Sequence, residues 1–133
     1  GSTFNLTVTS PIIVSEIGQA FYGPSTTATY EIWTSNTAIS GPPTISTTNG
    51  WTMIQTGSVT GLSNGLSPVV VSVPLTTPMI LSPGTYGFYV SGSSNVVYTT
   101  YGGGVATFTD AFTTIETGPG VGYGGSLPTP TFS

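Results

Sequence analysis

Apolar and polar residues alternate along the first part of the chain with the period of a β-strand. Phe4, Leu6 and Val8 are separated by single polar residues, which predicts a half-buried strand. Residues 12–17 and 27–34 have strand-like patterns of their own. Gly, Pro, Ser and Asn residues stand between these segments and favour turns. The N-terminal part therefore predicts three short strands.

The remainder of the chain continues in the same way. Further strands are expected at residues 51–59, 69–73, 79–81, 85–91, 95–101, 105–109 and 112–117. The segments 85–91 and 95–101 are expected to pair as an antiparallel hairpin. Eleven Pro and nineteen Gly leave no uninterrupted helical segment. About ten short strands predict one all-β domain over residues 1–133, a two-sheet antiparallel sandwich that is jelly-roll-like.

Four segments of the second half resemble an accessory module of large secreted and surface proteins of bacteria. They are WTMI at 51–54, ILSPGTYGFYV at 80–90, FTD at 108–110, and the Gly-rich stretch 118–125 that leads to TFS at 131–133. The resemblance rests mainly on residues 51–133. It implies a β-sandwich without assigned catalytic residues. Within this region, residues 118–133 form a Gly- and Pro-rich C-terminal segment.

Members of that family continue after the Phe-Ser pair with Pro-Arg and a closing strand, whereas this sequence stops at Ser133. The resemblance therefore implies a sheet edge without its last strand. An unpaired edge invites a strand from another copy. The alternatives are that the chain's own N-terminus fills the position or that the sequence is truncated. Residues 1–10, with Phe4, Leu6 and Val8 as the apolar face, are the preferred donor strand.

Composition narrows the possible partners. The chain contains no Lys, Arg, His or Cys, and Ser and Thr make up 43 of its 133 residues. Without cationic side chains it cannot replace counterions on phosphate or bind anionic lipid, so nucleic acid is excluded as a partner. No apolar run reaches the roughly 20 residues of a membrane-spanning helix, so no membrane insertion is expected. The sequence contains no signal peptide, and a secreted protein would have lost its leader before residue 1. A hydroxyl-rich surface costs less to desolvate than an ionic one, which favours an extracellular or cell-surface protein that packs against neighbours.

Catalysis is not expected. Without His, Lys or Cys, only a carboxylate can serve as a general base, and the four acids Glu16, Glu31, Asp110 and Glu116 are scattered. Calcium is the metal that suits oxygen ligands, and Asp110 or Glu116 would bind it. These acids otherwise serve solubility, and no other cofactor is expected.

Two further sites are candidates for binding or modification. Asn5 begins the one N-glycosylation sequon, with an ordinary strand asparagine as the alternative. Sugars stack on exposed aromatic rings, so Trp33, Glu31 and Tyr89 form a candidate carbohydrate site. The alternative is that these rings fill the core or a subunit contact.

The leading hypothesis is a structural subunit of an extracellular filament or surface assembly, which self-associates by strand exchange or packing. Its partners would be copies of itself. The second hypothesis is a carbohydrate-binding or adhesive module of a cell-surface protein, with glycans as partners. A viral capsid or spike jelly roll shares the same expected fold.

Overall fold

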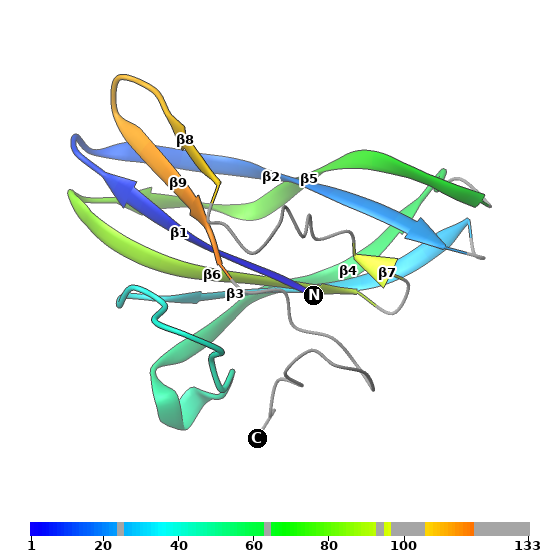
Figure 1. Ribbon diagram of the computed structural model, residues 1–133, viewed down its shortest axis with the longest axis horizontal. Coiled ribbons are helices and arrows are strands. Elements are labelled where there is room, and N and C mark those ends of the chain that lie inside the picture. The colour runs from blue at the N-terminus through cyan, green and yellow to red at the C-terminus, as the bar shows by residue number, and fades with distance from the viewer. Residues whose placement is uncertain (24–25, 63–64, 93–94, 97–105, 119–133) are drawn as a thin grey trace.

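The computed structural model describes residues 1–23, 26–62, 65–92, 95–96 and 106–118, and in this part the strands form two antiparallel sheets (Figure 1). The first sheet contains, in spatial order, β4 (Trp51–Thr60), β3 (Thr27–Ser35), β6 (Gly84–Gly92), β1 (Ser2–Val8), β9 (Thr113–Thr117) and β8 (Thr107–Thr109). The second contains β5 (Gly65–Leu81), β2 (Ile12–Gly23) and β7 (Asn95–Val96). A single 3-10 turn, η1 (Thr47–Asn49), precedes β4. The predicted all-β fold with two antiparallel sheets is confirmed.

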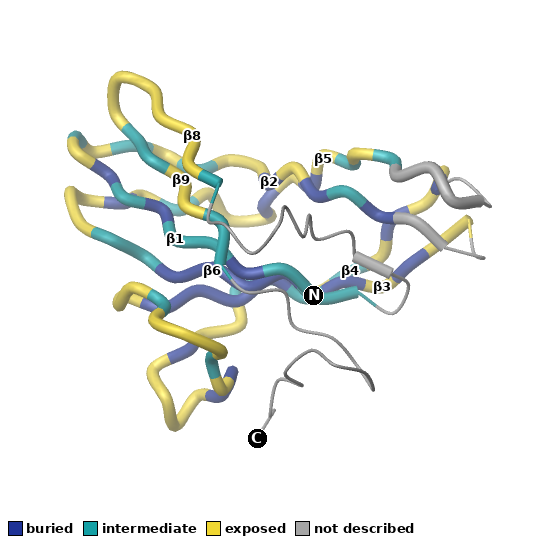
Figure 2. The backbone as a smooth tube through the Cα atoms, in the orientation of Figure 1, coloured by how far each residue is buried: buried dark blue, intermediate teal, exposed yellow. Residues whose placement is uncertain are grey.

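Both sheets contribute to one apolar core (Figure 2). Successive side chains of a strand point to opposite faces of the sheet, so alternate residues of each strand reach this core. The buried contributors include Leu6, Val8, Ile32, Phe88 and Val90 from the first sheet and Ile17, Phe21, Val73 and Leu81 from the second. Each such aliphatic or aromatic side chain stabilises the fold by about 1.5–3 kcal/mol relative to an exposed position.

A smaller apolar cluster lies on the opposite face of the first sheet. It contains Trp33, Ile45, Trp51 and Tyr89, with Ile39 packed against it. Trp33 and Tyr89 are cross-strand partners of β3 and β6. The connection between β3 and β4, residues 36–50, lies outside the first sheet (Figure 1) and supplies the two isoleucines. The first sheet is therefore covered on both faces at this position.

Two details differ from the sequence prediction. Residues 69–73 and 79–81 belong to one continuous strand, β5, although it contains Pro68, Pro74 and Pro78. Because β5 is the outer strand of its sheet, a missing N–H on its free side breaks no pairing. The expected hairpin of 85–91 with 95–101 is wrong: β6 pairs with β1 and β3, whereas β7 pairs with β2 in the other sheet. Residues 97–101 lie outside the described residues.

Candidate assembly site

β1 lies between two partners in the middle of the first sheet. It pairs with β6 along its whole length and with β9 from Phe4 to Val8. Leu6 and Val8 are buried in the core, at 7% and 2% exposure. The Phe4 ring stacks on Phe88, with ring centroids 5.1 Å apart and an angle of 2° between the planes. Phe4, Leu6 and Val8 thus face one way and meet the core of their own chain, as in the alternative in which the N-terminus fills the position.

The polar side chains of β1 also have partners on other elements. Thr7 Oγ1 lies 3.0 Å from Thr85 Oγ1 on β6. Ser2 Oγ donates to Gln19 Oε1 on β2 at 2.8 Å. The Asn5 amide accepts from the Ile39 N–H at 2.7 Å and donates to the Ile39 carbonyl at 3.2 Å. β1 therefore connects the first sheet to the second sheet and to the 36–50 segment.

A short connection carries the chain from β1 to β2. Only residues 9–11 separate Val8, in the first sheet, from Ile12, in the second. Thr9 donates from both its N–H and its Oγ1 to the carbonyl of Phe112, at 2.9 and 3.0 Å. This carbonyl belongs to the turn between β8 and β9, so the connection is attached to that hairpin.

Asp110 shapes the same turn. Its Oδ1 accepts hydrogen bonds from the N–H of Phe112 at 2.8 Å and from the N–H and Oγ1 of Thr113 at 2.6 and 3.0 Å. These bonds stabilise the charged carboxylate, and the Phe112 N–H contributes most to holding the pKa of Asp110 below its ordinary value. The carboxylate therefore orders the turn that contacts the β1–β2 connection.

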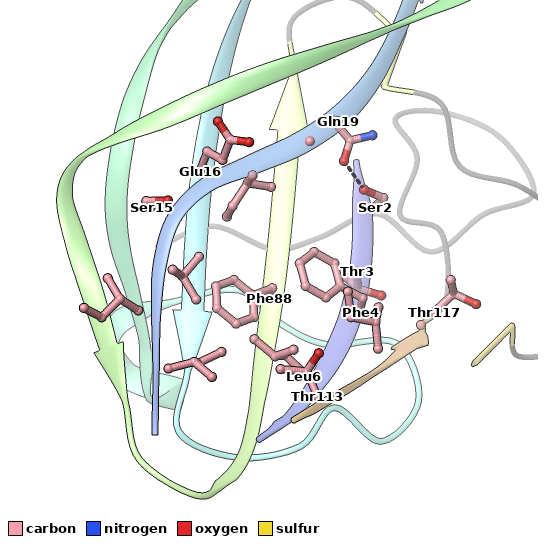
Figure 3. A pocket seen from close by; sticks show the side chains of 17 residues that line it. Ser2, Thr3, Phe4, Leu6, Ser15, Glu16, Gln19, Phe88, Thr113 and Thr117 are labelled. Atoms are coloured by element: carbon pink, nitrogen blue, oxygen red, sulfur yellow. Dashed lines mark hydrogen bonds between the residues drawn. The ribbon is translucent and has the colours of Figure 1, made fainter. Parts of the chain in front are cut away.

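A groove of about 520 Å³ runs along β1. β1, β2 and β9 line it, together with Phe88 of β6 (Figure 3). The sticks of Figure 3 show Phe4, Leu6 and Phe88 gathered on this side of β1. Within the described residues, β7 pairs with β2 only at Phe21 and Tyr22, so the rest of that β2 edge borders the groove. The face of β1 that carries Phe4 and Leu6 thus lines the groove.

The two rings of the candidate carbohydrate site are buried, and Glu31 is partly buried. Trp33 and Tyr89 are 8% and 2% exposed, and Trp33 Nε1 donates to Glu31 Oε2 at 3.0 Å. The structure brings the three residues together, yet the rings expose too little surface for a sugar to stack on them. Carbohydrate binding stays a prediction, and this arrangement corresponds to the alternative in which the rings fill a core.

The candidate metal ligands lie at separate positions of the β8–β9 hairpin. Asp110 is in the turn, whereas Glu116 is on β9, opposite Thr107 of β8 and Asn5 of β1. In the described part of the chain, no three His, Cys, Asp or Glu side chains gather as metal ligands. Asp110 Oδ1 is already engaged by three donors. Calcium binding stays a prediction that this geometry does not favour.

The sequon asparagine has a structural role in this arrangement. Both hydrogen-bonding atoms of the Asn5 amide bond to the main chain of Ile39. A glycan on Nδ2 would have to displace the bond to the Ile39 carbonyl. Asn5 therefore acts here as the strand asparagine of the alternative interpretation, and its glycosylation remains untested.

Sequence reasoning missed the residues that hold the β1–β2 connection. Thr9 bonds to a residue more than a hundred positions away, and no local pattern indicates such a contact. The turn itself had a signal: an Asp followed three residues later by Thr is typical of a side chain that bonds its own turn. The flanking strands β6 and β9 are likewise distant in sequence from β1.

No protein family, curated protein or solved structure matches the chain. In the described residues, no helix is long and apolar enough to span a bilayer.

Proposed function

We propose that the protein is a structural subunit of an extracellular filament or surface assembly, and that copies link to one another by exchanging β1. The observation that carries the proposal is the position of β1, which is paired on both sides and joined to β2 by the short connection 9–11. In this proposal the two sheets form a jelly-roll-like sandwich, as the sequence predicts. The same β1 from a neighbour makes every contact that the chain's own β1 makes.

Exchange of β1 should change the free energy of the protein only slightly. Pairing with β6 and β9, burial of Leu6 and Val8 and the Asn5 contacts are equal in the closed and exchanged forms. Only the 9–11 connection and the entropy of association differ. Exchange therefore depends on protein concentration and on the geometry of this connection. A hydroxyl-rich chain with only four acids adds little charge repulsion when copies pack together.

A cysteine pair on β1 and β6 tests the exchange. Thr7 and Thr85 are cross-strand partners, and the chain has no cysteine of its own. In the double variant Thr7→Cys/Thr85→Cys, oxidation after assembly joins β1 to whichever chain holds it. Exchange predicts a ladder of covalent oligomers on a non-reducing gel, because each β1 is then bonded to a neighbour.

The control is the same variant oxidised as a dilute monomer before it is concentrated. The bond then forms within each chain, and we expect this protein to remain free of linked oligomers. Deleting residues 1–10 should leave soluble, unlinked molecules, because the strand that would be exchanged is then absent. Assemblies of more than two copies that persist after this deletion, or intrachain bonds alone in the assembled double variant, would overturn β1 exchange.

A further inference from the structure

The free edges of the two sheets differ in how well they are protected. A free edge offers unpaired N–H and C=O groups and normally carries Pro, a charge or a bulge that prevents further pairing. β5 carries three prolines. β4 is tied to β5 through Gln55, which accepts from the Thr76 N–H at 2.8 Å and donates to the Pro74 carbonyl at 3.0 Å. The β2 edge borders the groove.

β7 is an edge strand of only two residues, so among the longer described edges β8 is the exception. It consists of Thr107, Phe108 and Thr109, all exposed, and it is the last strand of the six-stranded sheet. It contains no Pro, no charged residue and no register shift. Figure 1 shows the β8–β9 hairpin standing out beside the start of β2. In the described part of the chain, no strand pairs with the outer side of β8.

The hydrogen bonds of the hairpin define which main-chain groups of β8 face outward. The Asp110 N–H donates to the Thr113 carbonyl, and the Thr117 N–H donates to the Ala106 carbonyl, both at 2.9 Å. Bonded pairs alternate along an antiparallel ladder, so Phe108 directs its N–H and C=O toward Ile115. Thr107 and Thr109 then direct theirs away from β9, toward the free edge.

An apolar row on one face of the sheet leads to this edge. Leu6, Ile115 and Phe108 are cross-strand partners on β1, β9 and β8, and partners in register share a face. Their exposure rises outward, from 7% to 36% to 63%. The row begins in the core and ends uncovered at Phe108, so a strand added beyond β8 would continue it.

We propose that β8 pairs antiparallel with β8 of a second copy around a two-fold axis at Phe108. Thr107 of each copy then faces Thr109 of the other, and their outward groups exchange hydrogen bonds. Phe108 faces its own counterpart in a non-bonded pair, where side chains approach most closely. The inference rests on the proposed assembly function and deepens it, because it names the lateral contact between subunits.

Charge and symmetry favour a second copy as the occupant. The segment Thr107–Thr109 is self-complementary about its central residue, and the one charged neighbour in register, Glu116 opposite Thr107, lies on the face away from Phe108. Across a β9–β8–β8–β9 junction the two Glu116 residues are three strand spacings apart, about 14 Å. This exceeds the roughly 8 Å Debye length at physiological salt, so their repulsion is screened.

The test uses the Thr7→Cys/Thr85→Cys protein oxidised as a monomer, in which β1 cannot leave its chain. Sedimentation equilibrium over a range of concentrations should show a reversible monomer–dimer equilibrium. Phe108→Ala should weaken the dimer at least about tenfold, because it removes the apolar pair at the axis. Thr107→Pro should do the same by deleting an outward N–H, and the β8–β9 ladder keeps its bonds.

Val70→Ala is the matched control, since Val70 is 74% exposed on β5, which belongs to the other sheet. This substitution should leave the equilibrium unchanged. Circular dichroism and urea unfolding check that each variant is folded. A strictly monomeric locked protein, or a dimer unaffected by both β8 substitutions, would overturn the contact. Failure of the covalent ladder in the unlocked protein would overturn β1 exchange and leave this dimer intact, so the two proposals are tested separately.

Discussion

At the scale of single residues, two amide side chains take over pairing that main-chain groups would otherwise provide. Asn5 bonds the N–H and C=O of Ile39, and Gln55 bonds the Thr76 N–H and the Pro74 carbonyl. Each amide offers one donor group and one acceptor, as a main-chain peptide does. They attach the 36–50 segment and the β5 strand to the first sheet without any ion pair.

Asn5→Ala should lower the free energy of unfolding by about 1–3 kcal/mol. The substitution leaves the partly buried main-chain groups of Ile39 without their partner. Urea unfolding of the purified protein measures the change. Asn36→Ala is the control, because Asn36 is exposed and its loss should change stability by no more than about 0.5 kcal/mol. Equal effects from the two variants would contradict the role given to Asn5.

Asp110 should make a small pH-dependent contribution to stability. Its pKa is lowered in the folded state by the Phe112 and Thr113 donors, so the unfolded chain takes up a proton first as the pH falls. The contribution is complete above the unfolded pKa of about 4 and is lost as the pH falls through the lowered folded value. The difference in urea midpoint between the wild type and Asp110→Asn should be constant from pH 7 to about 5 and shrink as the pH falls further. A difference that shrinks between pH 7 and 5 would contradict this assignment.

At the scale of elements, the connection between β1 and β2 controls the proposed exchange. Four Cα–Cα steps from Val8 to Ile12 reach at most about 14 Å, which is enough to pass between sheets packed about 10 Å apart. Removing Ser10 and Pro11 leaves two steps, about 7 Å, and the chain can no longer place its own β1 in its own sheet.

Deleting Ser10 and Pro11 should therefore convert monomers into exchange-linked oligomers, which size-exclusion chromatography with light scattering would detect. Inserting four Gly and Ser residues after Ser10 should have the opposite effect, because a relaxed connection favours closure within one chain. A folded monomer from the deletion variant would show that β1 is not required in this position.

The same scale shows what the sequence can and cannot predict. The faces of β1 and β3 follow from their own period-two patterns, and the structure buries Leu6, Val8, Tyr30 and Ile32 accordingly. The burial of Trp33 does not follow, because Ile45 reaches it from a loop of no regular pattern. The pairing of β7 with β2 does not follow from the sequence either. Local patterns indicate that a strand is present, whereas the choice of its partner depends on tertiary packing.

At the scale of the whole molecule, the proposed contacts act in different directions. β1 exchange links copies through the middle of the first sheet, whereas β8 pairing joins them at its outer strand. The assembly hypothesis comes from the composition, and the long-range pairing of β1 with β6 and β9 supplies the residues on which the proposed exchange rests. The candidate ligand residues could be chosen from the sequence, but their burial depends on segments far from them in the chain.

The double pairing of β1 also determines how a chain of subunits would respond to tension. In an exchange-linked polymer, load passes from one subunit to the next along β1, parallel to its two ladders with β6 and β9. Hydrogen bonds pulled in this direction share the load and must break together, whereas bonds peeled from one end break in turn. Such a polymer would resist stretching by cooperative shear and rupture abruptly.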